Sequence, residues 1–170
     1  MDSALYFVTG APGSGKSTAL RAFLALETDV VAFDIDWLAD TASDLAGKSI
    51  YTDPTTWRPY NHLWFEVLHA IYRNGQTPVL FTPTDPHDVA KYGLPAWCAG
   101  VRWLLLDCAD ELRRERLMQR PGWTTEMVVE AIDDAHVLRE AVEARLDTGK
   151  RPPTEVALGI RDWLTGSKSA

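Results

Sequence analysis

Several features are scarce in this sequence, and each absence excludes a class of protein. The chain has two cysteines, Cys98 and Cys108, in 170 residues. Two are too few for a disulfide framework, and their spacing is not that of a zinc site. No apolar run approaches the roughly 20 residues that span a bilayer, and no secretory leader opens the chain. We therefore expect reduced thiols, no membrane partner and a cytoplasmic location.

Basic charge is also scarce. The chain has 17 lysines and arginines against 24 aspartates and glutamates, for a formal net charge of -7. Proteins that coat nucleic acid need a basic footprint, so we do not expect nucleic acid to be a partner. A few local cations would still suffice to hold an anionic ligand. The four histidines show no metal-ligand spacing, and the chain lacks the N-K-x-D sequence with which GTPases read guanine.

The length and the 46% apolar content indicate one domain, residues 1–170. Apolar runs predict buried strands at Ala4–Thr9, Val30–Phe33, Pro78–Thr82, Val101–Asp107 and, as a short last one, Leu146–Thr148. Apolar spacing predicts helices at Ser17–Leu26, Tyr60–Arg73, Asp110–Arg120, Thr124–Arg145 and Thr154–Leu164. The polar stretch between Asp36 and Pro59, and the loop at Pro83–Pro86, interrupt the pattern. Strands that alternate with helices predict an α/β protein with a parallel sheet.

A glycine-rich segment lies between the first strand and the first helix. Gly10–Ser17 matches the phosphate-loop pattern G-x-x-x-x-G-K-[ST] at every fixed position. Glycine lets successive N–H groups point at phosphate oxygens, and the helix start adds further donors. Lys16 is expected to reach the β and γ phosphates and to offset charge during transfer, Ser17 to ligate Mg²⁺, and Thr18 to approach the α phosphate. The nucleotide contacts are thus Gly13, Ser14, Gly15, Lys16, Ser17 and Thr18. The alternative is a turn that only joins a strand to a helix.

Two further features follow the second and fourth strands: the Asp34-x-Asp36 pair and an arginine-rich helix. With the phosphate loop, they make most of the chain resemble the small P-loop kinases related to nucleoside monophosphate kinases. The shikimate, gluconate and chloramphenicol phosphotransferase types, and unassigned AAA-type ATPases of this length, are the most similar. The resemblance implies a three-layer α/β/α sandwich, a five-stranded parallel sheet of order 2-3-1-4-5, a small mobile helical lid at about residues 113–125, ATP and Mg²⁺.

The carboxylate pair is the candidate for acceptor chemistry. Residues two apart on a strand project to the same side, so Asp34 and Asp36 can both face the crevice beyond the strand's carboxyl end. There they can bind a substrate hydroxyl, accept its proton, or support the water shell of Mg²⁺. The resemblance implies that Asp36 is the base and that Asp34 binds the metal or positions the substrate. Alternatively, one or both cap the following helix.

The arginines at 116 and 120 are four apart and therefore neighbours on one helix face, which suits a polyphosphate. The resemblance implies that Arg120 is a catalytic lid residue and that Arg116 packs on adenine or contacts phosphate. We expect Arg113 and Arg114 on a solvated face, paired with Glu111 or Glu115. By position, Thr148–Pro152 falls where the family contacts adenine.

The sequence indicates less clearly which residues bind the phosphoryl acceptor. The glycine triplet of shikimate kinases is missing after the third strand, where Phe81–Asp85 stands instead, and this argues against shikimate. Within that segment Thr82, Thr84 or Asp85 can contact Mg²⁺ through water. Arg58 is a candidate for holding an anionic acceptor, or else a surface residue. Three tryptophans are candidates for the acceptor pocket or for the core: Trp37, Trp57 and Trp64.

The function that the sequence predicts is ATP-dependent transfer of the γ-phosphoryl group to a hydroxyl of a metabolite or antibiotic-like small molecule. One alternative is a kinase for nucleosides, nucleotides or nucleic-acid ends, which uses the same machinery with a different pocket. Another, of a different class, is an ATP-binding regulatory module, which has no need of a base. We expect a monomer or a homodimer.

Overall fold

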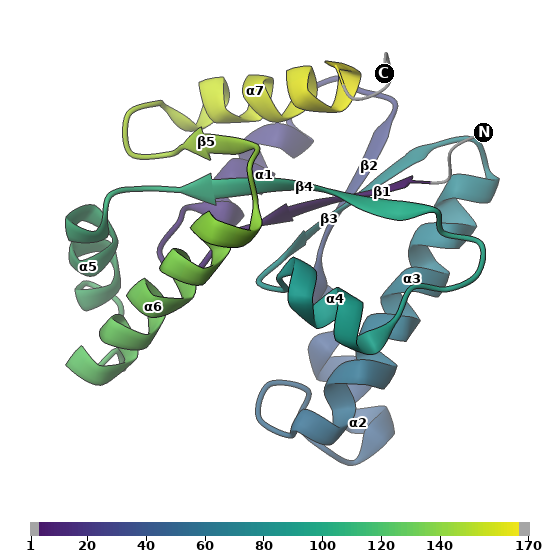
Figure 1. Ribbon diagram of the computed structural model, residues 1–170, viewed down its shortest axis with the longest axis horizontal. Coiled ribbons are helices and arrows are strands. Elements are labelled where there is room, and N and C mark those ends of the chain that lie inside the picture. Colours follow the sequence, from purple (N-terminus) through teal and green to yellow (C-terminus); the bar gives the residue numbers. More distant parts are fainter. Residues whose placement is uncertain (1–3, 167–170) are drawn as a thin grey trace.

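The computed structural model describes residues 4–166 of the chain. Five parallel strands form one sheet in the order β2-β3-β1-β4-β5, which confirms the predicted order (Figure 1). The strands are β1 Ala4–Thr9, β2 Val30–Asp34, β3 Thr77–Thr82, β4 Gly100–Asp107 and β5 Arg145–Asp147. The helices are α1 Lys16–Leu24, α2 Ala39–Ala46, α3 Trp57–Arg73, α4 Pro86–Tyr92, α5 Asp110–Met118, α6 Thr125–Ala141 and α7 Pro153–Gly166, with 3-10 turns η1 Ile35–Leu38 and η2 Pro54–Thr56.

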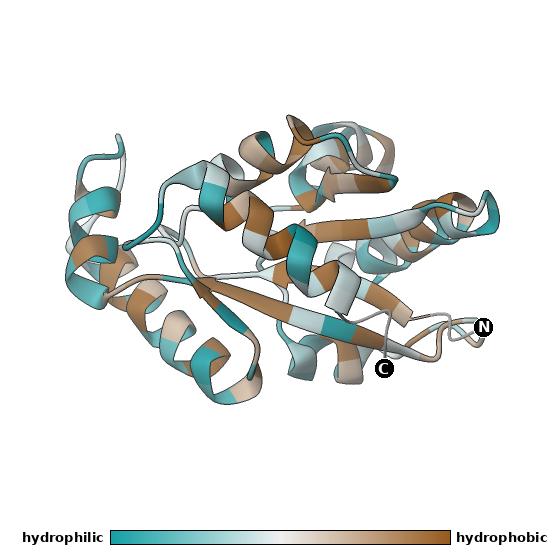
Figure 2. Ribbon diagram, turned by 90° about the horizontal axis from the view of Figure 1, so that it is seen from above, coloured by the Kyte–Doolittle hydropathy of each residue, from teal (hydrophilic) through white to brown (hydrophobic). Residues whose placement is uncertain are grey.

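The sheet is buried on both faces, because helices cover each of them. Tyr6 and Val8 of β1 pack in one core with residues of α1 and α7, while Leu5 and Phe7 pack in another with residues of α3. This division follows from the strand period of two. Figure 1 shows α1 and α7 on one side of the sheet and α3, α4 and α6 on the other, and Figure 2 shows the apolar character of the strands. The predicted α/β/α sandwich is therefore confirmed.

Two helices lie where the sequence predicted irregular chain. The helix α2 falls within the polar stretch after Asp36, and α4 follows the prolines after β3. The start of α4 carries ordinary helix signals, because the side chain of Asp85 accepts a 2.9 Å hydrogen bond from the N–H of Asp88 and Pro86 occupies the first turn. The helix α6 ends at Ala141, earlier than predicted, and the chain then extends to join β5.

The parallel arrangement brings the carboxyl ends of all strands to one edge of the sheet. The phosphate loop follows β1, Asp34 ends β2, Asp107 ends β4, and Thr148 follows β5. Ligands of open α/β sheets bind at this edge. Within residues 4–166, no helix is both long and apolar enough to cross a membrane. Both cysteines are buried and free, as expected.

Candidate active site

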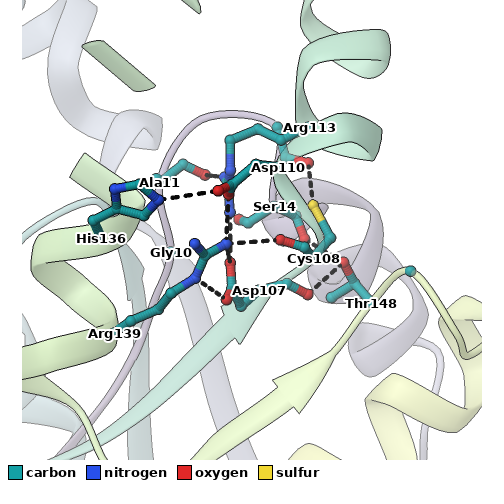
Figure 3. Close-up of polar contacts among 12 residues, drawn as sticks. Gly10, Ala11, Ser14, Asp107, Cys108, Asp110, Arg113, His136, Arg139 and Thr148 are labelled. Carbon is teal, nitrogen blue, oxygen red and sulfur yellow. Dashed lines mark hydrogen bonds and ion pairs between the residues drawn. The ribbon is translucent and has the colours of Figure 1, made fainter. Parts of the chain in front are cut away.

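The carbonyl groups of the phosphate loop are bound from outside the loop. Arg113 Nη1 on α5 donates to the Pro12 oxygen at 2.6 Å and to the Ala11 oxygen at 3.3 Å, while Arg116 Nη1 donates to Gly13 at 3.2 Å. Thr148 Oγ1 donates to the Ser14 oxygen at 2.7 Å (Figure 3). The Ser14 N–H is used within the loop, where it donates to the Ala11 oxygen at 3.1 Å, and the other N–H groups of the loop are left for an anion. This arrangement is an anion-binding nest.

Two glycines of the loop are required by close contacts. Gly13 has φ +79°, and a Cβ there would lie 3.0 Å from Leu117 Cγ and 3.1 Å from Arg113 Cγ. Gly10 has no room for a side chain either, because its Cβ would lie 2.5 Å from the backbone oxygen of Leu106 on β4. The loop is therefore packed against α5 and the sheet. Its glycines permit this close approach as well as the positive φ angle of the turn.

Arg113 corrects one expectation from the sequence. It was predicted on a solvated face with Glu111 or Glu115, but it is 0% exposed. Besides the loop carbonyls it binds Asp107, with Nη2 2.6 Å from Oδ1. A buried guanidinium needs a carboxylate and several acceptors, and this site supplies both. Arg114, its neighbour, is exposed as predicted.

Asp107 connects three elements at the end of β4. It binds Arg113 of α5 through Oδ1 and Arg139 of α6 through Oδ2, the latter at 2.6 Å. Arg139 also binds Asp110 at 2.7 Å, and His136 lies 3.0 Å from the same aspartate (Figure 3). These contacts lower the pKa of Asp110 to about 2, with Arg139 as the main cause. The network holds α5 and α6, and through Arg113 the phosphate loop, in fixed relation to the sheet.

A cavity of about 500 Å³ opens on one side of the phosphate loop. We call it the arginine-lined cavity, and its walls are Gly13, Gly15, Thr18, Ala19, Arg116, Gln119, Arg120, Thr148, Gly149, Arg151, Pro153 and Val156. Loop residues, the two α5-region arginines and the segment after β5 thus line one cavity; that a nucleotide binds there stays a prediction. Arg116 is held in place by Thr148, to which it donates at 3.2 Å (Oγ1) and 3.1 Å (O).

Lys16 of the phosphate loop is influenced by the charged side chains around it. Its ammonium donates to the Gly10 carbonyl. Burial lowers the pKa of Lys16 to about 8; Asp34 opposes this shift, and the charges of Arg113 and Arg120 add to it. The charges of Asp34, Asp36 and Arg120 therefore all act on Lys16. A bound polyphosphate would favour the charged ammonium.

A larger cavity, of about 640 Å³, opens on the other side of the loop. We call it the aspartate-lined cavity. It is bounded by the loop, η1, α3 with the segment before it, the segment after β3, α4 and α6. Its walls are Ala11, Pro12, Ile35, Asp36, Ile50, Tyr51, Trp57, Tyr60, Asn61, Pro83, Thr84, Asp85, Asp88, Tyr92, Asp134, Val137 and Leu138. Because Ala11 and Pro12 line one cavity while Gly13 and Gly15 line the other, the phosphate loop lies between them.

The two predicted carboxylates differ in their surroundings. Asp34 Oδ1 accepts a 3.1 Å hydrogen bond from the N–H of Asp36, so Asp34 caps η1, as one of the alternatives proposed. Asp36 lines the aspartate-lined cavity. Its pKa is raised, first by burial and then by the charge of Asp34, while Lys16 opposes the rise. Asp36 thus presents a carboxylate of raised pKa at the wall of this cavity.

Several acceptor-side candidates lie elsewhere. Arg58 is exposed and is not among the described residues that line the aspartate-lined cavity. Trp64 is a core residue, 1% exposed, and Trp37 is 55% exposed outside the cavity wall, so of the three tryptophans only Trp57 lines it. After β3, Thr84 and Asp85 reach the wall, whereas Thr82 is buried and donates to Thr84.

The residues that the sequence did not reveal as functional are mostly distant from one another in the chain. Arg113 and its partner Asp107 are the main examples, together with Asp88 and Asp134 at the cavity wall. One signal was present for Arg113: it lies four residues before the buried Leu117, so it occupies the apolar face of α5. A basic residue on such a face indicates a buried ion pair.

The loop fits a nucleotide's phosphates. The positive-φ glycines, the outward carbonyls, Lys16 and the start of α1 form a cradle for an anion. For Mg²⁺ the fit is simpler, because this ion usually keeps several waters and takes few protein ligands. Ser17 is exposed in the first turn of α1, and Asp34 acts electrostatically on the adjacent Lys16. Hydroxyl and carboxylate oxygens are suitable donors for this ion.

Comparison with known proteins supports these observations at the level of the fold. No family model matches the chain, and no curated protein matches it in sequence. Among solved structures, a sugar kinase from Janibacter sp. has a TM-score of 0.65 at 20% identity, with 96% of this chain and 95% of that chain covered. A tunicamycin resistance protein from Deinococcus radiodurans has a TM-score of 0.65 at 19% identity, with 95% of each chain covered.

A shikimate kinase from Aquifex aeolicus has a TM-score of 0.59 at 17% identity, with 97% of this chain and 98% of that chain covered. All three likenesses extend over nearly the whole chain. They agree with a fold whose parallel sheet has the strand order 2-3-1-4-5. The chain has the fold of the small P-loop kinases.

Proposed function

We propose that this chain is a kinase that transfers the γ-phosphoryl group of ATP to a hydroxyl of a small molecule. The observation that carries the proposal is the phosphate loop between two cavities, one lined by arginines and the other containing the carboxylate of Asp36. Donor and acceptor can then approach the loop from opposite sides. Two of the structural neighbours are a sugar kinase and a shikimate kinase, which supports the proposal.

On the donor side, the loop's N–H groups and Lys16 bind the phosphates, and Arg116 borders the nucleotide. Arg120, as a residue of the lid at 113–125, adds charge where negative charge shifts during transfer. The buried Arg113 and Leu117 hold the first part of that segment against the rest of the protein. Ser17 would ligate Mg²⁺ and Asp34 would support its water, and the ion would offset negative charge on the nucleotide's phosphates.

On the acceptor side, Asp36 orients the substrate hydroxyl and takes its proton. The hydroxyl oxygen attacks the γ phosphorus, the bond from that phosphorus to the bridging oxygen breaks, and the proton passes to the Asp36 carboxylate. The products are ADP and a phosphate monoester. A base with a raised pKa holds the proton more readily, so the environment of Asp36 assists this step.

A search for the product tests the proposal. Purified protein is incubated with ATP, Mg²⁺ and a pooled library of metabolites, antibiotics and nucleosides, and mass spectrometry records any compound that gains a phosphoryl group. We expect a phosphorylated small molecule with the wild type and none with Lys16→Met. If only nucleosides or nucleic-acid ends were phosphorylated, the acceptor would belong to that class and not to the metabolites or antibiotics. Nucleotide-controlled partner binding without any transfer would replace the kinase by a regulatory module.

A further inference from the structure

The aspartate-lined cavity has charged residues of one sign only. Among the described residues that line it, the charged ones are Asp36, Asp85, Asp88 and Asp134, with no lysine, arginine or histidine. They come from η1, the start of α4, α4 itself and α6. Since distant segments supply them, local chain geometry does not explain why they share one cavity wall.

Only one of these carboxylates has a clear structural task. Asp85 caps α4, with Oδ1 2.9 Å from the N–H of Asp88, and it lies 3.5 Å from the exposed His87. For Asp36, Asp88 and Asp134, no cationic nitrogen of the described residues lies within ion-pair distance.

The nearest cations are committed elsewhere or lie in solvent. Lys16 acts on Asp36 but belongs to the phosphate loop, and Arg113 acts on Asp134 but binds Asp107 and the loop carbonyls. Lys91 and His87 act on Asp88 and are both exposed. The pKa values of Asp36, Asp88 and Asp134 are all raised, first by burial and next by a neighbouring carboxylate. The cavity therefore carries negative charge that the protein does not neutralise.

Aromatic rings accompany the carboxylates. The cavity is also lined by Tyr51, Trp57, Tyr60 and Tyr92. The polar atoms of three of them are used within the protein. Tyr60 donates its hydroxyl to the Ile35 carbonyl, Trp57 Nε1 donates to the Ile50 carbonyl at 3.0 Å, and Tyr51 donates its hydroxyl to Asp40 Oδ1 at 3.2 Å. Trp57 and Tyr51 are 40% and 54% exposed and can offer ring surface to a ligand, whereas Tyr60 is buried. Aromatic faces and carboxylates both attract cations.

We propose, on the basis of the kinase function above, that the acceptor is a positively charged polyhydroxyl compound, with its hydroxyl at Asp36 and a protonated amine at Asp88 and Asp134. The cavity of about 640 Å³ beside the phosphate loop is the site, and the carboxylates determine its charge preference. An anionic hydroxy acid would be repelled by the same wall. Arg58, the candidate for holding such an anion, does not line it.

Calorimetry with charge-graded probes tests this preference without requiring turnover. The protein is saturated with Mg²⁺ and a non-hydrolysable ATP analogue and titrated with glucosamine, glucose and gluconate, and with a three-ring aminoglycoside against maltotriose. We expect the amine-bearing probe of at least one set to bind about tenfold or more tightly than its neutral counterpart, which corresponds to one productive ion pair. Equal or weaker binding of both amines, or no binding by any probe, would overturn the inference.

The same probes with ATP separate the two proposals. Transfer to glucose, maltotriose or gluconate but not to the amines would overturn the charge preference and leave the kinase in place. Charge-selective binding without transfer to any member of the sets or of the pooled library would overturn the kinase and leave the charge preference.

Two variants locate the amine. We expect Asp88→Asn and Asp134→Asn each to weaken binding of the amine probe about tenfold, with nucleotide affinity unchanged. The matched control is Glu140→Gln, an exposed carboxylate on α6 outside the cavity wall, which should change neither. If the aspartate variants bind the neutral and the charged probes equally more weakly than the wild type does, or if neither affinity changes, the amine is not bound by Asp88 and Asp134.

Discussion

Lys16 is the residue at which burial and phosphate binding act in opposite directions. Burial lowers its pKa to about 8, and a polyphosphate favours the protonated form. Nucleotide binding should therefore be at full strength below pH 8 and weaken as pH rises through it, approaching about tenfold in Kd per pH unit for one linked proton. Calorimetry across that range measures this slope. Lys16→Met should bind weakly and without the slope, and a constant wild-type Kd would refute the linkage.

Arg113 couples the stability of the fold to the phosphate loop. Replacing it with Met leaves the Pro12 carbonyl without its donor, although the Ala11 carbonyl keeps the Ser14 N–H and Asp107 keeps Arg139. Removing one partner of a buried pair costs about 3–5 kcal/mol, and we expect the lower part of that range for the free energy of unfolding. Urea unfolding measures the loss, and calorimetry should show weaker nucleotide binding.

The matched control is the exposed neighbour, in the variant Arg114→Met, which should change stability by no more than about 0.5 kcal/mol. Arg113→Lys provides a folded intermediate case, since it keeps the charge but loses the fork that serves several acceptors. If Arg113→Lys and Arg114→Met were both as stable as the wild type and bound nucleotide as well, Arg113 would not support the loop.

At this scale the sequence was informative wherever the chemistry is local. Gly10–Ser17 is contiguous, so its pattern alone predicts a phosphate cradle. Arg113 was predicted at the surface because its acceptors at Ala11, Pro12 and Asp107 come from other elements, two of them about a hundred positions away in the chain. The residue pattern within one helix does not reveal partners that come from other elements.

Among the elements, the loop between β1 and α1 is supported by α5. Gly13→Ala places a Cβ against Leu117 and Arg113 and also forces alanine into positive φ. The backbone term alone costs about 1–2 kcal/mol. Gly47→Ala is the matched control, because Gly47 has φ +63° and nothing lies within 4 Å of its Cβ position.

In thermal or urea unfolding, we expect the free energy of unfolding to fall in both variants by the backbone cost, and to fall further in Gly13→Ala. Only Gly13→Ala should weaken nucleotide binding, because the loop must shift away from α5. Equal losses in the two variants, with unchanged nucleotide affinity, would contradict the close packing of the loop against α5.

Element prediction succeeded for strands and failed for short helices. The apolar runs of β1 and β4 are typical of buried strands, because the strands of a parallel sheet are covered on both faces. The helices α2 and α4 have 8 and 7 residues, too few for a clear apolar period. For α4 the capping aspartate at 85 and the following Pro86 were interpreted as a loop, although the same residues start a helix.

At the scale of the molecule, the predicted sandwich and strand order are confirmed. The acceptor side was not predictable in the same way, because its wall combines residues from Ala11 to Leu138 that no single motif contains. The donor side, by contrast, depends largely on one loop and on one helix with the residues that follow it. This difference explains why the sequence supports a kinase better than it supports any particular acceptor.

The most direct test of the central claim measures two properties of one variant, Asp36→Asn. With an acceptor found by the product search, we expect single-turnover phosphoryl transfer to slow by about 10²- to 10⁴-fold, as for loss of a general base. The affinity for a non-hydrolysable ATP analogue should stay within about threefold of the wild type, or about 0.65 kcal/mol. Transfer by the variant at a near wild-type rate would contradict the account.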